Sequence, residues 1–229
     1  LLFDNKMKYI ISILVILMFF LSACSLQSPL SKDTSECASL EGSAKDDCYL
    51  EDRKCSKIDN ELVRDGCVVE LAKIKEDVKV CKLIVTDNVK AHCQEQIAEL
   101  TNNHDICKEI TDQYWKDNCN FHLAINNNKD VYCSLVKNNE QRAGCFNDIA
   151  QETENYLLCE FLADKSRDTC VYNIAKKTED FELCEELIDS MGRAMCKLKV
   201  AKLTEDASKC ELINSNDVRA LCEEYLGVN

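Results

Sequence analysis

Residues 81–106 read CKLIVTDNVKAHCQEQIAELTNNHDI, and residues 107–132 read CKEITDQYWKDNCNFHLAINNNKDVY. Each stretch begins with a cysteine, has a second cysteine 12 positions later, and is followed 14 positions after that by the next cysteine. This spacing recurs along the chain with small variations, so the sequence contains eight aligned units of about 26 residues. The first link, from Cys48 to Cys55, is shorter by seven residues, or about two helical turns.

Aliphatic residues recur at fixed offsets from these cysteines. One lies three positions after every first cysteine, and another lies four positions after the second cysteine in units two to eight. Offsets of three and four match the period of an α-helix, whereas a strand has a period of two. The first set is Leu40, Ile58, Ile84, Ile110, Val136, Leu162, Leu187 and Ile213, and the second is Leu71, Ile97, Leu123, Ile149, Ile174, Val200 and Leu226.

Each unit is therefore expected to form a short helix, a tight turn and a longer helix of about 14 residues. Asp87, Asp112, Asn139 and Asp164 are candidate N-caps of the longer helices. One proline and five glycines argue against a β-sandwich or barrel. A single unit could not bury its apolar side, so the units must stack. The predicted fold class is all-α, a disulfide-stapled α-solenoid of about eight helical hairpins.

The parity of the cysteines favours one disulfide pattern. Pairing within units uses all sixteen repeat cysteines, whereas pairing across the 14-residue links leaves Cys37 and Cys222 unpaired. Each within-unit bridge would contribute about 3 kcal/mol in the entropic description of loop closure. The expected pairs are Cys37–Cys48, Cys55–Cys67, Cys81–Cys93, Cys107–Cys119, Cys133–Cys145, Cys159–Cys170, Cys184–Cys196 and Cys210–Cys222.

The start of the chain has the pattern of a secretory signal. Met7, Lys8 and Tyr9 precede an apolar run over residues 10–21, which is shorter than the roughly 20 residues of a membrane span. The four residues that begin at the end of this run, Leu21-Ser22-Ala23-Cys24, resemble the lipobox of prokaryotic lipoproteins. This resemblance implies cleavage before Cys24 and a diacylglyceryl thioether on its sulfur, with palmitate-type acyl chains.

Three regions are expected. Residues 1–23 would be the signal peptide, with residues 1–6 an artefact of an upstream start site. Residues 24–35 would be the lipidated cysteine and a flexible tether that contains the single proline of the chain. Residues 36–229 would form the helical repeat domain.

Charge and cysteine chemistry narrow the function classes. The formal net charge of −13 disfavours binding to nucleic acid and leaves the lipid as the expected membrane contact. Sixteen thiols could instead hold metal, but the chain lacks the C-x2-C spacing of zinc and soft-metal sites, so we expect disulfides and no metal or cofactor. His92, His104 and His122 occupy different repeat offsets and are expected to be exposed or capping.

The motifs of common hydrolases and nucleotide-binding enzymes are absent from the sequence, and no unit stands out by polar residues that its siblings lack. No catalytic residue is therefore assigned, and the chain is not expected to be an enzyme.

A basic residue lies three positions before every second cysteine. Such a charge near a helix start opposes the helix dipole, which implies a compensating carboxylate or the terminal carbonyls of the short helix. We expect this basic ladder to be structural; a stripe that binds an anionic surface polymer is the alternative. Its members are Lys45, Arg64, Lys90, Lys116, Arg142, Arg167, Arg193 and Arg219.

The architecture is similar to that of Sel1-like cysteine-rich repeat proteins, whose units are longer and whose cysteines are spaced differently, so no binding residues are carried over. The expected function is a lipid-anchored interaction or scaffold module of the cell envelope. It would be extracytoplasmic, and its partner would be an envelope protein or a surface polymer. A metal-buffering lipoprotein with reduced thiols and an envelope hydrolase remain alternatives.

Overall fold

The computed structural model describes residues 34–228, so the expected signal peptide, Cys24 and most of the tether lie outside the described residues. The described part is helical and is stapled by repeated disulfides, which confirms the predicted fold class. It divides into two compact units, with the boundary between Asp59 and Asn60. Within residues 34–228, no helix is long and apolar enough to cross a membrane.

The first unit contains the first repeat and the start of the second. Its elements are α2 (Thr34–Ala38), α3 (Ser43–Glu51) and the 3-10 helix η1 (Cys55–Lys57). The disulfide between Cys37 and Cys48 joins α2 to α3. Gly42 precedes α3 with φ of 59°, a backbone conformation that glycine adopts without steric cost. Leu40, predicted to be a core position, is 40% exposed because it lies in the loop that ends at this turn.

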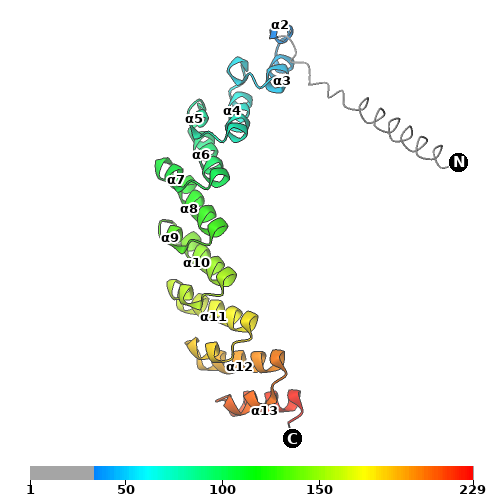
Figure 1. The fold of residues 1–229 in the computed structure, drawn as a ribbon, viewed down its shortest axis with the longest axis vertical. Helices are drawn as coiled ribbons and strands as arrows, with labels where there is room; N and C mark the ends of the chain where they lie inside the picture. Colours follow the sequence, from blue (N-terminus) through cyan, green and yellow to red (C-terminus); the bar gives the residue numbers. More distant parts are fainter. Residues whose placement is uncertain (1–33, 229) are drawn as a thin grey trace, which may run out of the picture. The chain divides into compact units, whose positions relative to one another are not determined.

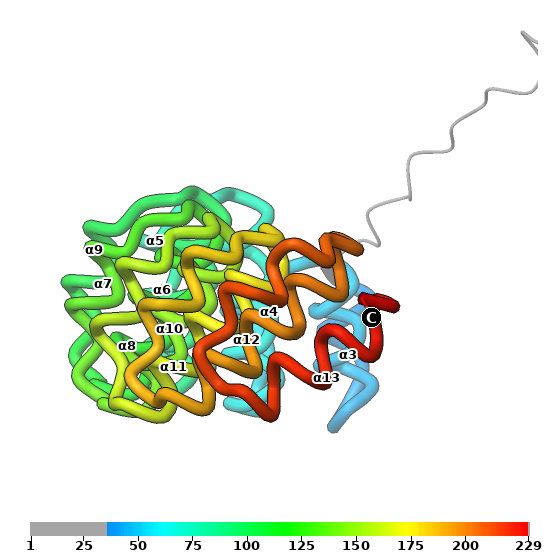
Figure 2. The backbone as a smooth tube through the Cα atoms, turned by 90° about the horizontal axis from the view of Figure 1, so that it is seen from below, coloured from blue at the N-terminus to red at the C-terminus, as the bar shows by residue number. Residues whose placement is uncertain are grey.

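The second unit stacks seven long helices side by side. Each long helix contacts the long helix of the next repeat and the short helices next to it in the chain. Figures 1 and 2 show α5, α7 and α9 along one side of this stack and α6, α8 and α10 along the other. The long helices are α4 (Glu61–Lys75), α6 (Asp87–Thr101), α8 (Gln113–Asn127), α10 (Asn139–Thr153), α11 (Asp164–Thr178), α12 (Ser190–Thr204) and α13 (Asn216–Leu226).

Short helices connect the long ones and carry the first cysteine of each pair. Two are a single turn, and three are 3-10 helices, the form that short connecting segments commonly take. They are α5 (Val78–Cys81), α7 (His104–Glu109), α9 (Asp130–Cys133), η2 (Tyr156–Phe161), η3 (Glu182–Glu186) and η4 (Ala207–Leu212).

The predicted N-caps are correct at one position and shifted by one at the others. The Asp112 side chain accepts a hydrogen bond from the Trp115 amide, as a cap should. Asp87, Asn139 and Asp164 are the first helical residues instead. The cap needs an extended backbone, and the residue before each of them has it. Polar side chains are also favoured in the first helical turn, so composition alone does not separate the two positions.

The far ends of the long helices repeat one backbone motif. Six of them end at a non-glycine residue with φ between 49° and 57°: Glu76, Asn102, Asn128, Glu154, Glu179 and Glu205. In each case the next amide donates to the carbonyl of the alanine that follows the buried aliphatic position; one example is Asn155 to Ala150, at 3.1 Å. These bonds satisfy carbonyls that a helix end would otherwise leave free.

Cysteines and the repeated aliphatic residues form most of the core. Ile84, Ile110, Leu123 and Ile174 are at most 2% exposed. Leu71, Leu162 and Leu226 also occupy predicted core positions but are only partly buried. The core is thin, because each repeat contributes few large apolar side chains.

The cysteines are oxidised within repeats. All sixteen cysteines from Cys37 to Cys222 are disulfide-bonded, and they form eight pairs. The described bridges join the expected partners at Cα–Cα distances of 5.5–5.8 Å: Cys37–Cys48, Cys81–Cys93, Cys107–Cys119, Cys133–Cys145, Cys159–Cys170, Cys184–Cys196 and Cys210–Cys222. Cys55 and Cys67 are disulfide-bonded as well. This density of disulfides indicates an oxidising, extracytoplasmic environment.

Candidate functional site

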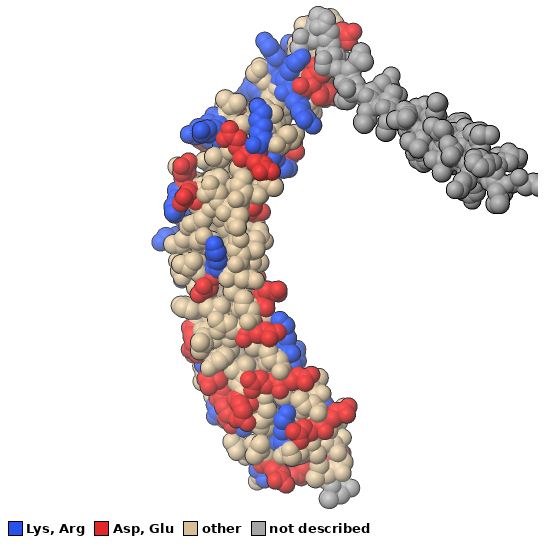
Figure 3. Space-filling model, viewed as in Figure 1, with Lys and Arg blue, Asp and Glu red and all other residues tan. Residues whose placement is uncertain are grey.

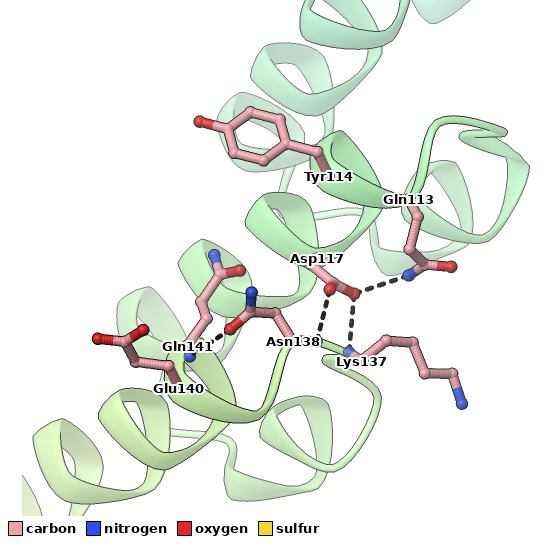
Figure 4. Close-up of a pocket in the computed structure, with 7 residues that line it drawn as sticks. All are labelled: Gln113, Tyr114, Asp117, Lys137, Asn138, Glu140 and Gln141. Carbon is pink, nitrogen blue, oxygen red and sulfur yellow. Dashed lines mark hydrogen bonds between the residues drawn. The ribbon is translucent and has the colours of Figure 1, made fainter.

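Aspartates join neighbouring repeats at every other junction of the second unit. The Asp117 carboxylate on α8 accepts the Lys137 and Asn138 amides of the next repeat at 2.9 and 2.8 Å, as Figure 4 shows. Asp65 accepts two amides of its next repeat in the same way, at 3.2 and 3.0 Å, and Asp168 does so at 2.8 and 3.0 Å. Sequence reasoning missed these contacts. The signal was an aspartate two positions before the second cysteine in every other repeat of this unit.

The carboxylate of Asp65 is stabilised in its charged form. Burial by itself would raise the pKa of Asp65, but hydrogen bonds from Thr86 and from the Val85 amide outweigh it, so the pKa lies below its usual value. This aspartate has no exposed surface. Its two backbone donors therefore serve as the local substitute for water.

Three members of the basic ladder share one contact. Arg142, Arg193 and Arg219 each donate to a carbonyl at the end of the short segment of their own repeat. The acceptors are the carbonyls of Val136 at 3.0 Å, Leu187 at 2.7 Å and Ile213 at 2.8 Å. These are the terminal carbonyls that the sequence predicted as partners of the positive charge.

The other members of the ladder are less uniform. Arg167 contacts the Glu160 carboxylate at 2.6 Å and the Glu186 carbonyl of the next repeat at 2.7 Å. Lys45 pairs with Asp59 at 2.7 Å within the first unit. Two further pairs, Arg64–Glu61 at 3.9 Å and Lys90–Asp87 at 3.2 Å, lie on exposed helix surfaces, and the Lys116 side chain has no ion pair among residues 34–228.

A cluster of carboxylates and imidazoles lies between α6 and α8. Glu95 Oε1 is 2.8 Å from His122 Nδ1, and Glu95 Oε2 is 3.2 Å from His92 Nδ1. Glu99, one turn after Glu95 on α6, places Oε1 against the same His122 Nδ1. One ligand atom from each of Glu95, Glu99 and His122 lies within 4.8 Å of the other two. We call these three residues with His92 the Glu–His cluster.

The ionisable side chains of the Glu–His cluster shift one another's pKa values. Burial favours a raised pKa for both carboxyl groups, and it raises the pKa of Glu99. At Glu95 burial is the largest single influence and would raise the pKa, but the hydrogen bonds with His122 and Glu99 and the charges of His122 and His92 together lower it. The hydrogen bond with Glu95 raises the pKa of His122. The cluster therefore prefers a cation, either a proton or a metal ion, between Glu95 and Glu99.

The expectation of exposed or capping histidines was correct only in part, because the His92 and His122 side chains are 40% and 44% exposed. His92, His104 and His122 are partly buried, and each bonds a polar side chain. The expectation that no unit stands out was wrong, because the third repeat alone has glutamates both two and six positions after its second cysteine. Comparing offsets within single repeats hid the cluster, since Glu95 and His122 are 27 positions apart and meet only when repeats stack.

Grooves lie at the junctions made by Asp117 and Asp168. The groove between α11 and α12 has a volume of about 890 Å³, and Tyr172, Ile188 and Met195 line it among acidic residues. The equivalent groove between α8 and α10, about 580 Å³, includes Tyr114 and is shown in Figure 4. Ile188 and Met195 are 56% and 45% exposed, and they lie together in this groove.

Charge is unevenly spread over the second unit. In the face drawn in Figure 3, acidic side chains gather over α11, α12 and α13, whereas the surface over α8 and α10 carries fewer charges. The groove between α11 and α12 thus combines apolar side chains with an acidic surrounding that includes Asp164 and Asp189. In comparisons with protein-family models, curated proteins and solved structures, nothing matches this chain.

Proposed function

We propose that this chain is a lipid-anchored, extracytoplasmic interaction module that binds another envelope protein in the groove between α11 and α12. The observation that carries the proposal is the groove itself, with exposed Ile188 and Met195 beside acidic residues. Helical solenoids present long surfaces for partners. The expected partner segment carries apolar side chains flanked by lysine or arginine, because these complement both features of the groove.

The basic ladder is a less suitable surface for an anionic polymer. Its arginines at positions 142, 193 and 219 are engaged with backbone carbonyls of their own repeats. A polymer would have to compete with these intramolecular bonds. The contacts therefore support a protein partner over a surface polymer.

The groove is tested by site-specific photo-crosslinking of the full chain in intact cells. A photoreactive residue at Met195 should give a discrete adduct, whereas one at Leu62, which is 72% exposed on α4, should not. Ile188→Glu should abolish the adduct formed from position 195, because it places a charge in the apolar part of the groove. Equal labelling from both positions, or an adduct that survives Ile188→Glu, would refute the proposed surface.

The anchor is tested separately through Cys24. Replacement of Cys24 by alanine should move the protein from the membrane fraction to the soluble fraction while leaving its melting temperature unchanged, since residue 24 precedes the repeats. Metabolic labelling with a palmitate analogue should fail in the same variant. Retention in washed membranes without labelling would contradict lipid anchoring.

A further inference from the structure

The Glu–His cluster has the composition and spacing of a metal site. Glu95 and Glu99 are separated by four positions on α6, so their side chains lie on one face of that helix. His122 on α8 contacts both carboxylates through Nδ1. Two carboxylates and one imidazole form a donor set that zinc and other first-row divalent ions accept.

A single proton on His122 cannot supply hydrogen bonds to both carboxylates of this cluster. The single Nδ1 of His122 faces two carboxylate oxygens, and it has at most one hydrogen to donate. Glu99 Oε1 is buried and lies against His122 Nδ1, but it has no hydrogen-bond partner among the described residues. Glu95 is 4% exposed, and a buried carboxylate requires full compensation. A divalent cation would bind both carboxylates at once and neutralise their charge.

The groups around the cluster hold the donor atoms in place. His92 Nδ1 contacts Glu95 Oε2, the oxygen that does not face His122. The Trp115 ring packs on the His92 ring with their centroids 4.5 Å apart, and Trp115 in turn donates to Asn88 Oδ1 at 2.5 Å. Such a hydrogen bond to the second oxygen of a ligand carboxylate is the usual way in which proteins orient metal ligands.

The cluster is open to solvent on one side. Glu99 and Gln96 line a cavity of about 360 Å³ together with Lys73, Leu100 and Asn126. The His122 side chain is 44% exposed. An ion could therefore enter from solvent, and a water molecule could complete its coordination.

We propose that Glu95, Glu99 and His122 bind one divalent first-row metal ion, with zinc as the expected ion, and that His92 orients Glu95. The third and fourth repeats are joined here without a buried aspartate, since Ala91 stands at the position equivalent to Asp65 and Asp117. The metal ion would link α6 to α8 across this junction. This inference is independent of the groove between α11 and α12.

The experiment uses the full chain, purified in detergent without a histidine tag and stripped of metal with a chelator. Zn²⁺ should raise the melting temperature in a saturable way, because an ion that binds the folded state stabilises it. Co²⁺ should produce a visible absorption band that Zn²⁺ displaces. Thiol titration of the denatured protein establishes that free cysteines do not supply the ligands.

Four variants decide between a metal site and a purely structural cluster. Glu99→Gln and His122→Gln should each weaken Zn²⁺ binding more than about 100-fold, and His92→Gln should weaken it about 10- to 100-fold, as loss of an orienting group does. His104→Gln is the matched control, because His104 bonds Asn120 and stacks on Tyr132 without a carboxylate partner. It should bind Zn²⁺ as the wild type does.

Two outcomes would overturn the proposal. One is the absence of any saturable effect of Zn²⁺ or Co²⁺ on the wild type. The other is unchanged Zn²⁺ affinity in Glu99→Gln, even if the metal-free variant melts at a lower temperature. Glu99 is the decisive position, because its side chain is 31% exposed and its replacement leaves the buried Glu95 paired with both histidines.

Discussion

The junctions between repeats of the second unit are of two kinds, and they alternate. After the second, fourth and sixth repeats, Asp65, Asp117 and Asp168 bind two backbone amides of the following repeat. After the third, fifth and seventh repeats, the equivalent residues are Ala91, Ala143 and Ala194. We call these aspartate junctions and alanine junctions. Within the second unit, the aspartate contact thus recurs at every other junction. The first unit does not follow this alternation, because Asp46 of the first repeat also accepts an amide of the next repeat, that of Asp59, at 2.8 Å.

The alanine junctions are held by contacts that differ from one to the next. The Glu–His cluster lies at the first of them. At the second, Gln151 donates to the Cys170 carbonyl at 3.0 Å and Phe146 stacks on Phe161. At the third, the buried Lys197 donates to the Leu212 carbonyl at 3.2 Å. One kind of junction is thus uniform, and the other is where individual side chains specialise.

The largest expected effect comes from a bridge within a repeat. Replacing Cys107 and Cys119 together by alanine should lower the free energy of unfolding by about 2 to 5 kcal/mol, measured by chemical denaturation. This bridge joins α7 to α8, next to one junction of each kind. A loss smaller than that of any single junction variant would mean that the junctions, and not the bridges, hold the array together.

Asp117→Ala converts an aspartate junction to the alanine kind. It should lower the free energy of unfolding by about 1 to 3 kcal/mol, because two partly buried backbone hydrogen bonds lose their acceptor. Hydrogen exchange should accelerate at the amides of Lys137 and Asn138 before it does so elsewhere. If the loss is below about 0.5 kcal/mol, the two kinds of junction are energetically equivalent and the comparison fails.

The junction made by Asp65 should weaken in acid. The pKa of Asp65 is lower in the folded state than the unfolded value of about 3.9. The Asp65 carboxylate therefore contributes fully to the free energy of unfolding above its pKa in the unfolded chain. This contribution is lost as the pH falls through its pKa in the folded protein. The stability difference between wild type and Asp65→Ala should be constant from about pH 7 to pH 5 and should shrink below about pH 4. A difference independent of pH down to strong acid would exclude the charge as its source.

Arg142→Met tests a contact within one repeat, against which the contacts between repeats can be compared. Loss of the bond to the Val136 carbonyl should cost about 1 kcal/mol, while methionine keeps most of the packing of the stem. Lys116→Met is the matched control at the same repeat position, and its cost should stay below about 0.5 kcal/mol because Lys116 has no ion pair among residues 34–228. Equal costs in both variants would show that the ladder contributes through packing alone.

The smallest expected effect is a gain. Ala143 lines a cavity of about 460 Å³ between α10 and α11, so an aspartate has room there. Ala143→Asp should raise the free energy of unfolding by about 0.5 kcal/mol if its carboxylate reaches the amides of residues 163 and 164. The change in the free energy of unfolding is measured by urea titration, together with thermal denaturation, of the variant and the wild type. A destabilised variant would show that the geometry of an alanine junction excludes the aspartate contact.

The sequence predicted the repeat because its signals are local. Two cysteines 11 or 12 residues apart and aliphatic residues at offsets of three and four report on one helical hairpin, and the hairpin forms within a single repeat. The prediction that Leu40 is a core residue was wrong because this residue lies in the loop before Gly42 and is 40% exposed. The contacts of Asp117 and of the Glu–His cluster were not predicted, because the bonded residues lie 20 to 27 positions apart, in neighbouring repeats. Contacts of that kind depend on how repeats stack, which periodicity within one repeat does not specify.

The described bridges close loops inside repeats and leave the links between them uncrosslinked, which determines how the chain responds to mechanical force. Under tension, bridged cysteines 12 positions apart, such as Cys81 and Cys93, stay together, whereas the segment from Cys93 to Cys107 is free to extend. That segment reaches roughly 50 Å when fully extended. When the two ends of the array are pulled apart, the links between repeats would extend one at a time. The hairpins would stay closed by their disulfides, so refolding would start from intact hairpins. The lengths of the links therefore set the maximum extension of the array under force.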